Sequence, residues 1–152
     1  MQYLQTLRTI SFAFIMSQIM FLGVVIFLHS SGQKPENGSG LPDSTWLIMS
    51  FLAIVLILAG RFLFQQKIKV AQEKSSLQEK LAEHRTAWLL RIALTEAASL
   101  FSIVLSMLSG DLRLLGIAVV VIAYMLTFIP SKNSIINDLA LTYPMTDELE
   151  QA

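Results

Sequence analysis

Apolar residues are gathered along this chain into four long blocks, with polar segments between them. The blocks lie at about residues 9–28, 46–64, 87–108 and 112–129. A helix needs roughly 20 apolar residues to cross the hydrocarbon core of a bilayer. The pattern therefore predicts an all-α, polytopic membrane protein whose four transmembrane helices make one domain over residues 1–152.

The first two connecting segments differ in composition. Residues 30–45 are rich in Gly, Pro, Asn and Ser, which is typical of a loop. Residues 65–86 instead keep helix-forming residues on both sides of Ser75-Ser76, which offers an N-cap. The two arms measure about 15 Å and about 18 Å at a rise of 1.5 Å per residue. Because the arms match in length, we expect the second and third helices to extend beyond the bilayer as an antiparallel stalk. Its expected seam contains Val70, Leu77, Leu81 and Trp88.

The third connection and the C-terminal segment complete the predicted topology. Residues Ser109-Gly110-Asp111 predict a tight turn, so that the four helices form two antiparallel hairpins. Pro130 ends the fourth helix, because proline cannot continue the helical hydrogen bonds. In the tail, residues 131–152, a short amphipathic helix is expected first, and the acidic residues 142–152 are expected to be loose.

The placement of Lys and Arg predicts the orientation. If both termini are cytoplasmic, nine of the eleven basic residues lie on the cytoplasmic side, including those of the stalk. Cytoplasmic segments of membrane proteins carry such an excess. We therefore expect the stalk (65–86) and the tail (131–152) to be cytoplasmic and the loop (30–45) to be extracytoplasmic. A cleaved signal peptide is the alternative interpretation of the first block, although its apolar core exceeds the usual length of about 7–15 residues.

Composition narrows the class of function. Hydrophobic residues make up 54% of the chain and charged residues 14%, against roughly 25% charged in soluble domains. The formal net charge of zero argues against a nucleic-acid partner. The chain has no cysteine and no HExxH, P-loop or nucleophile-elbow motif. We therefore expect no enzymatic activity, cofactor or metal, and we expect the partners to be the lipid bilayer and other membrane proteins, copies of this chain included.

One ionisable residue, Glu96, falls inside the third apolar block. Such a residue is costly at membrane depth and is a functional-site hypothesis by default. Glu96 lies about nine residues inside the block, or roughly 13 Å, and Gln18 has a similar depth in the first block. We predict a buried Gln18–Glu96 contact, with Arg61 or Arg91 as the candidate counter-charge. Two interpretations remain open: a neutral Glu96 that holds helices together, or a Glu96 that carries a proton or a cation.

Hydroxyl residues mark one face of the third helix. Their spacings of four, three, four and three place Thr95, Ser99, Ser102, Ser106 and Ser109 on that face. Small residues allow membrane helices to approach closely, so the face predicts a helix-packing seam. A hydrated path along the same face is the alternative. We also expect Gly60 and Gly116 to mark close approaches, and His29 and His84 to be solvated.

Two resemblances add expectations. The motif A-L-T-E-A-A-S-L-F at residues 93–101 resembles the carboxylate helix of rotor-ring c subunits of rotary ATPases. That resemblance implies that Glu96 carries a proton or a sodium ion, with Gln18 and Ser99 as helpers. It covers about one helix and lacks the glycine-rich stripe and the R-Q-P turn of those subunits.

Most of the chain resembles small four-helix inner-membrane proteins of uncharacterised function in bacteria. There a similar Ala-x-x-Glu helix precedes a hairpin and a last helix ended by proline. That likeness implies the bacterial inner membrane and no activity. We therefore expect an accessory or scaffolding subunit that self-associates or binds a larger membrane complex through its stalk and its serine face. The alternative is a proton- or cation-translocating element built on Glu96.

Overall fold

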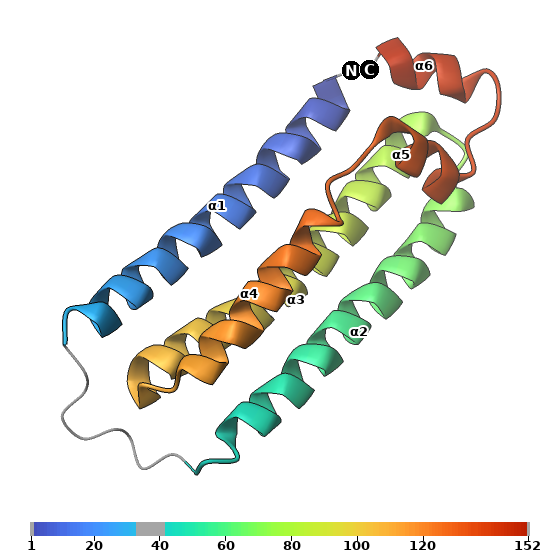
Figure 1. The fold of residues 1–152 in the computed structure, drawn as a ribbon. Helices are drawn as coiled ribbons and strands as arrows, with labels where there is room; N and C mark the ends of the chain where they lie inside the picture. Colours follow the sequence, from blue (N-terminus) through green and yellow to red (C-terminus); the bar gives the residue numbers. More distant parts are fainter. Residues whose placement is uncertain (1, 33–41, 152) are drawn as a thin grey trace.

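The computed structural model describes residues 2–32 and 42–151. Within these residues the chain forms helices and no strand, which confirms the all-α class. The first four helices run alongside one another with alternating direction, and the last two gather at the end that holds both termini (Figure 1). The elements are α1 (Gln2–Ser30), α2 (Thr45–Gln72), α3 (Leu77–Ser109), α4 (Leu112–Leu126), α5 (Lys132–Leu139) and α6 (Met145–Gln151).

Three of the helices are long and apolar enough to cross a membrane. These are α1, α2 and α3, with 29, 28 and 33 residues, and α4 is apolar but has only 15. At 1.5 Å per residue α4 is about 22 Å long, whereas the hydrocarbon core is about 30 Å thick. The fourth predicted block therefore ends earlier than residue 129. Pro130 explains this, because the residue before a proline avoids the helical region.

The chain satisfies the backbone carbonyls that are left free after α4 ends. Trp88 Nε1 on α3 donates to the carbonyl oxygen of Phe128 at 3.3 Å, and Arg8 Nε on α1 donates to that of Pro130 at 3.1 Å. Buried carbonyls without a partner cost free energy, so these two bonds stabilise the early helix end. They also join α1 and α3 to the segment that leads into α5.

Helix α3 lies at the centre of the structure. It packs against α1, α2 and α4, whereas α1 packs mainly against α3 and α4 rather than against α2. The first two helices are antiparallel, as predicted, but α1 packs against α3 and α4 instead of against α2 (Figure 1). A long connection does not force consecutive helices to be neighbours, and the inward residues of α1 face α3 instead.

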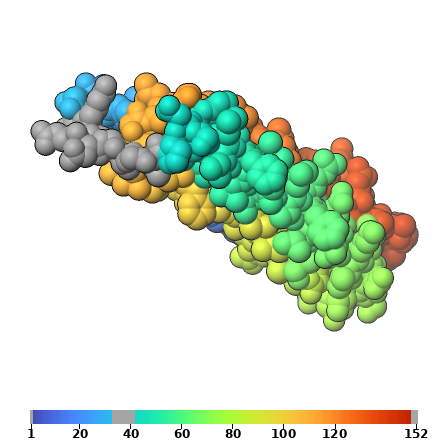
Figure 2. All heavy atoms as spheres, turned by 90° about the horizontal axis from the view of Figure 1, so that it is seen from below, coloured from blue at the N-terminus to red at the C-terminus, as the bar shows by residue number. Residues whose placement is uncertain are grey.

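The turn between α2 and α3 follows the sequence prediction. The Ser76 hydroxyl caps α3 by accepting from the backbone N–H of Glu79, and Lys80 Nζ donates to the carbonyl oxygen of Gln72 at 2.7 Å. The two helices form one tip of an elongated molecule, with the C-terminal segment beside it (Figure 2). Of the predicted seam, Leu77, Leu81 and Trp88 are buried.

Val70 was wrongly assigned to that seam, because 48% of it is exposed. The buried residues of α2 in this region are Phe64, Ile68 and Ala71. Their spacings of four and three define one helical face, and Val70 lies off it.

The arms of α2 and α3 do not form a free two-helix stalk. The start of α1 and the helices α5 and α6 cover them and share one apolar core with them. The amphipathic α5 begins as predicted, with the Ser131 hydroxyl accepting from the N–H of Ser134, and Ile135 and Leu139 are buried. Residues 142–152 are predicted to be loose, but α6 forms there and places Leu149 in the same core. α6 packs there because the arms of α2 and α3 offer it an apolar surface.

Gly60 allows α2 and α3 to approach closely. A Cβ added there would lie 3.3 Å from the carbonyl oxygen of Arg91 and 3.5 Å from the Cβ of Leu94. A Cβ added at Gly116 would meet nothing within 4 Å, so the predicted close approach at that residue is wrong.

We predict that Gly60→Leu destabilises the fold by about 1–3 kcal/mol, the usual cost of overpacking. The added side chain would collide with the backbone of α3 and force the two helices apart. Unfolding in mixed detergent micelles, followed by circular dichroism, measures the change. Gly23→Leu is the control, since a Cβ at Gly23 meets nothing within 4 Å. Equal stabilities of the two variants would contradict the close approach.

Candidate functional site

The structure brings Gln18 of α1 and Glu96 of α3 together. The Gln18 amide Nε2 donates to Glu96 Oε1 at 3.1 Å. Gln18 is completely buried, and Glu96 is partly buried. This is the contact that the matched depths of the two residues predict from the sequence. A carboxylate among apolar residues gains from such a donor, because an unpaired polar group is costly there.

The sequence of α1 explains why Gln18 faces α3. The buried residues of α1 follow one helical stripe, and Gln18 occupies a position where an apolar residue would be expected. The stripe consists of Leu7, Ser11, Ile15, Gln18 and Val25. On α3, Glu96 lies at the edge of the buried hydroxyl face, next to Thr95, which accounts for its partial exposure.

The hydroxyl face of α3 lies inside the chain. Thr95, Ser99, Ser102 and Ser106 are all at most 1% exposed, and Ser109 is partly buried. Because these residues are covered by the other helices, this face cannot also be an outer contact surface. The expectation that the serine face contacts a partner is therefore wrong.

Two buried oxygen atoms with free hydrogen-bonding capacity belong to residues next to Glu96, one on its hydrogen-bond partner and one on the next turn of α3. Gln18 Oε1 and Ser99 Oγ are buried and have no hydrogen-bond partner within the described residues. Ser99 follows Glu96 by three residues, so both lie on neighbouring turns of one face. Carboxylate, amide and hydroxyl oxygens suit a proton or a hard cation. Within residues 2–32 and 42–151 there is no cluster of three or more His, Cys, Asp or Glu side chains for a metal.

Neither predicted counter-charge lies at Glu96. Among the described residues, no salt bridge joins Glu96 to Arg61 or Arg91. The Arg91 guanidinium instead lies over the Phe128 ring, 3.9 Å from its centroid, and 5.1 Å from that of Phe64. Five residues separate Arg91 from Glu96, which is about 140° around a helix of 3.6 residues per turn. The two side chains therefore face different neighbours.

A second polar cluster was missed from the sequence. His84, expected to be solvated, is 1% exposed and lies between α1 and α5. Its Nδ1 is 2.8 Å from the Tyr3 hydroxyl, and its Nε2 is 3.6 Å from Asp138 Oδ2. The Tyr3 hydroxyl also donates to the carbonyl oxygen of Leu81 at 3.0 Å. The signal was present, because His84 falls on the same face as Leu77, Leu81 and Trp88.

In this cluster the Tyr3 hydroxyl has a shifted pKa. Burial raises the pKa of its hydroxyl above the usual value, and the nearby Arg85 guanidinium lowers it by a smaller amount. The phenol is therefore held in its neutral, hydrogen-bonding form, in which it ties the start of α1 to α3.

Comparison with protein-family models, curated proteins and solved structures gives no match for this chain. Both resemblances drawn from the sequence therefore stay predictions.

We predict that Gln18 and Glu96 are energetically coupled. In a double-mutant cycle of Gln18→Leu and Glu96→Leu, the loss of stability in the double variant should fall short of the sum by about 0.5–1.5 kcal/mol, as for other hydrogen bonds between membrane helices. Unfolding in mixed micelles measures each variant. Ser17→Ala combined with Glu96→Leu is the control, since Ser17 is exposed and should be additive. Additivity in both cycles would show that the contact contributes nothing.

We predict that stability falls at high pH partly through Tyr3. Because folding raises the pKa of the Tyr3 hydroxyl, the buried Tyr3 contributes its full stabilisation at pH values below about 10, the pKa in the unfolded chain. Above that pH the unfolded chain ionises first, so the stabilisation is lost as the pH rises. Tyr3→Phe should therefore lose less thermal stability than the parent from about pH 9 to about pH 11. The exposed Tyr143 provides the control variant, Tyr143→Phe, which should follow the parent. Parallel curves for all three proteins would contradict this.

Proposed function

We propose that the chain is a four-span protein of the bacterial inner membrane and acts as a non-enzymatic accessory or scaffolding subunit. The observation that carries the proposal is the set of large apolar side chains that α1, α2, α3 and α4 expose on the surface. Examples are Phe12, Phe51, Phe101 and Val120, each more than half exposed. Contiguous apolar surface of this kind marks contact with a membrane or with another protein.

The fourth span requires a short helix to cross the bilayer. α4 is only about 22 Å long at the helical rise, but apolar residues continue beyond it as Phe128 and Ile129. A short span is accommodated by local thinning of the bilayer at a modest cost. At its other end, Arg113 forms an ion pair with Asp111 at 2.9 Å, which keeps that charge at the boundary.

The end that holds the termini is proposed to be cytoplasmic. Both termini and the α2–α3 turn lie at one end of the molecule, as an even number of spans requires (Figure 1). Nine of the eleven Lys and Arg residues belong to that half of the predicted topology. This excess supports the orientation.

The contact surface of a scaffold would be the exposed apolar faces of α1 and α2. The hydroxyl face is used inside the chain, and the cytoplasmic end is closed by α5 and α6. Among the described residues, α1 and α2 expose more large apolar side chains than α3 and α4, so their outward faces are the proposed contact surface for a second copy or for a larger membrane complex.

A proton- or cation-translocating element is the second candidate. Glu96 with Gln18 and Ser99 favours it, because Gln18 donates to Glu96, Ser99 lies one turn further along α3, and Gln18 Oε1 and Ser99 Oγ are unpaired within the described residues. The likeness of residues 93–101 to rotor-ring c subunits points the same way.

The topology is tested by introduced cysteines, because the parent has none. We predict that Ser31→Cys reacts with a membrane-impermeant maleimide in intact spheroplasts, whereas Ser75→Cys reacts only after lysis. Both serines are exposed, so the difference reports the side of the membrane. Labelling of Ser75→Cys in intact spheroplasts would overturn the orientation.

Measurements of ion flux and of the assembly state distinguish the two proposed functions. For a scaffold we expect the protein in mild detergent to copurify as a particle heavier than one chain and reconstituted liposomes to show no proton or sodium flux. Glu96→Gln should then change stability but not assembly. Flux in the parent that Glu96→Gln abolishes would establish the second candidate instead.

A further inference from the structure

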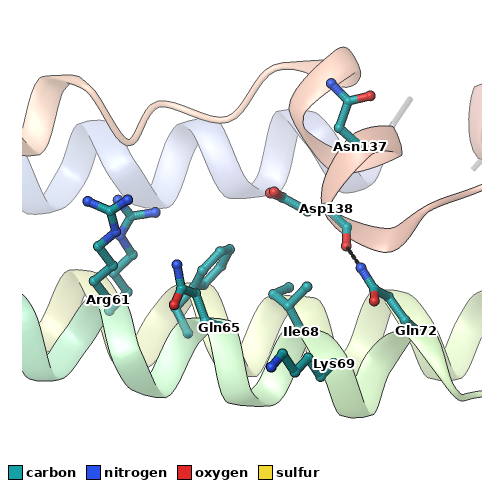
Figure 3. A pocket seen from close by; sticks show the side chains of 9 residues that line it. Arg61, Gln65, Ile68, Lys69, Gln72, Asn137 and Asp138 are labelled. Atoms are coloured by element: carbon teal, nitrogen blue, oxygen red, sulfur yellow. Dashed lines mark hydrogen bonds between the residues drawn. The ribbon is translucent and has the colours of Figure 1, made fainter.

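A pocket of about 740 Å³ lies where α2, α3 and α5 meet, at the end of the molecule that holds the termini. Arg61, Gln65 and Gln72 line it along α2, and Asp138 lies opposite them on α5, where Asn137 contributes to the rim (Figure 3). The pocket does not include Gln18 or Glu96, and its α2 residues run from the polar end of the predicted second span into the predicted stalk. The remaining lining residues are Phe64, Ile68, Lys69 and Arg91.

The pocket carries a surplus of positive charge. Arg61, Lys69 and Arg91 line it against a single carboxylate, Asp138. Asp138 does not neutralise the arginines, because its carboxylate lies 3.6 Å from His84 Nε2 and accepts from the Ser134 hydroxyl at 3.3 Å. Among the described residues no salt bridge involves Arg61, Lys69 or Arg91.

The two arginines are close neighbours across the α2–α3 contact. The backbone of Gly60 approaches the carbonyl oxygen of Arg91 so closely that an added Cβ would lie 3.3 Å from it. Arg61 follows Gly60 directly, so both guanidinium groups start from the same crossing point. Arg91 Nε is buried and has no hydrogen-bond partner within the described residues. Two like charges that line one pocket repel each other, and an anion bound there would offset that repulsion.

Phosphate oxygens match these donors. The guanidinium group presents a planar fork of N–H donors that pairs with phosphate. The side-chain amide of Gln65 adds a neutral donor on the α2 wall. Gln72 is already engaged, since its Nε2 donates to the carbonyl oxygen of Asp138 at 2.7 Å and fixes α5 against α2 (Figure 3).

The surroundings of the pocket favour a lipid as the source of the phosphate. Leu58 and Phe62 on α2 are 58% and 59% exposed and flank Arg61. Basic pockets between membrane helices on the cytoplasmic side bind anionic headgroups. We propose that this pocket binds the headgroup phosphate of an anionic phospholipid, with Arg61 and Arg91 as the phosphate ligands and the acyl chains along α2. The inference rests on the membrane placement proposed above.

The experiment measures lipid binding to the delipidated full-length protein in detergent by native mass spectrometry. Phosphatidylglycerol should bind about tenfold or more tightly than phosphatidylcholine with the same acyl chains, and Arg61→Gln should remove about tenfold of that affinity, as for a charge-assisted hydrogen bond. Arg61 is the residue of choice because it is exposed, whereas Arg91 also packs on Phe128. Arg61→Lys, which keeps the charge but not the fork, should bind with intermediate affinity.

The matched control is Lys67→Gln. Lys67 lies on the same helix but outside the pocket, where it pairs with Glu83 at 3.6 Å, so its removal should leave phosphatidylglycerol binding unchanged. Equal binding of the two lipids, or an Arg61→Gln variant that binds like the parent, would overturn the proposal. Inorganic phosphate that binds as tightly as phosphatidylglycerol would overturn the lipid assignment. Lipid binding is measured in detergent, whereas the membrane topology is measured by cysteine labelling. The experiments therefore show separately whether the lipid site or the proposed topology is wrong.

Discussion

A polar group inside an apolar bundle is costly unless the chain itself supplies a partner, and the arrangement of α3 reflects this constraint. Thr95 and Ser102 donate to carbonyl oxygens of their own helix, so they can be buried at little cost. Glu96 has no such local partner and takes its hydrogen bond from Gln18. The position of α1 against α3, rather than against α2, thus places a donor where α3 needs one.

At the end that holds the termini, the same constraint is met by different means. There the chain closes the end with the short helices α5 and α6, and α5 brings a polar group to the buried ring of His84. His84 joins Tyr3 of α1 to Asp138 of α5, and Trp88 reaches the free carbonyl oxygen of Phe128. The apolar core is most extensive here, so α5 and α6 form one packed unit with the longer helices.

The sequence predicted how deep a residue lies along its helix, but it did not predict toward which neighbouring helix the side chain points. Counting residues at a fixed rise placed Gln18 and Glu96 at one level, and the turn at Ser76 followed from capping chemistry. The count gave no orientation around the axis, so Arg91 was expected at Glu96 although it faces the ring of Phe128. The docking of α6 depends on apolar surface assembled from distant segments, which no local pattern of residues 142–152 reveals.

The use of the hydroxyl face bears on the choice between scaffold and ion carrier. A carrier would need polar groups that lead from Glu96 toward the opposite end of the bundle. Ser102 donates to the carbonyl oxygen of Ala98 and Ser106 to that of Asp111, and both are buried beside the apolar contacts of α3 with α1 and α4. Hydroxyls that are committed to the backbone serve close helix packing. The face therefore favours a fixed structural carboxylate, and with it the scaffolding role.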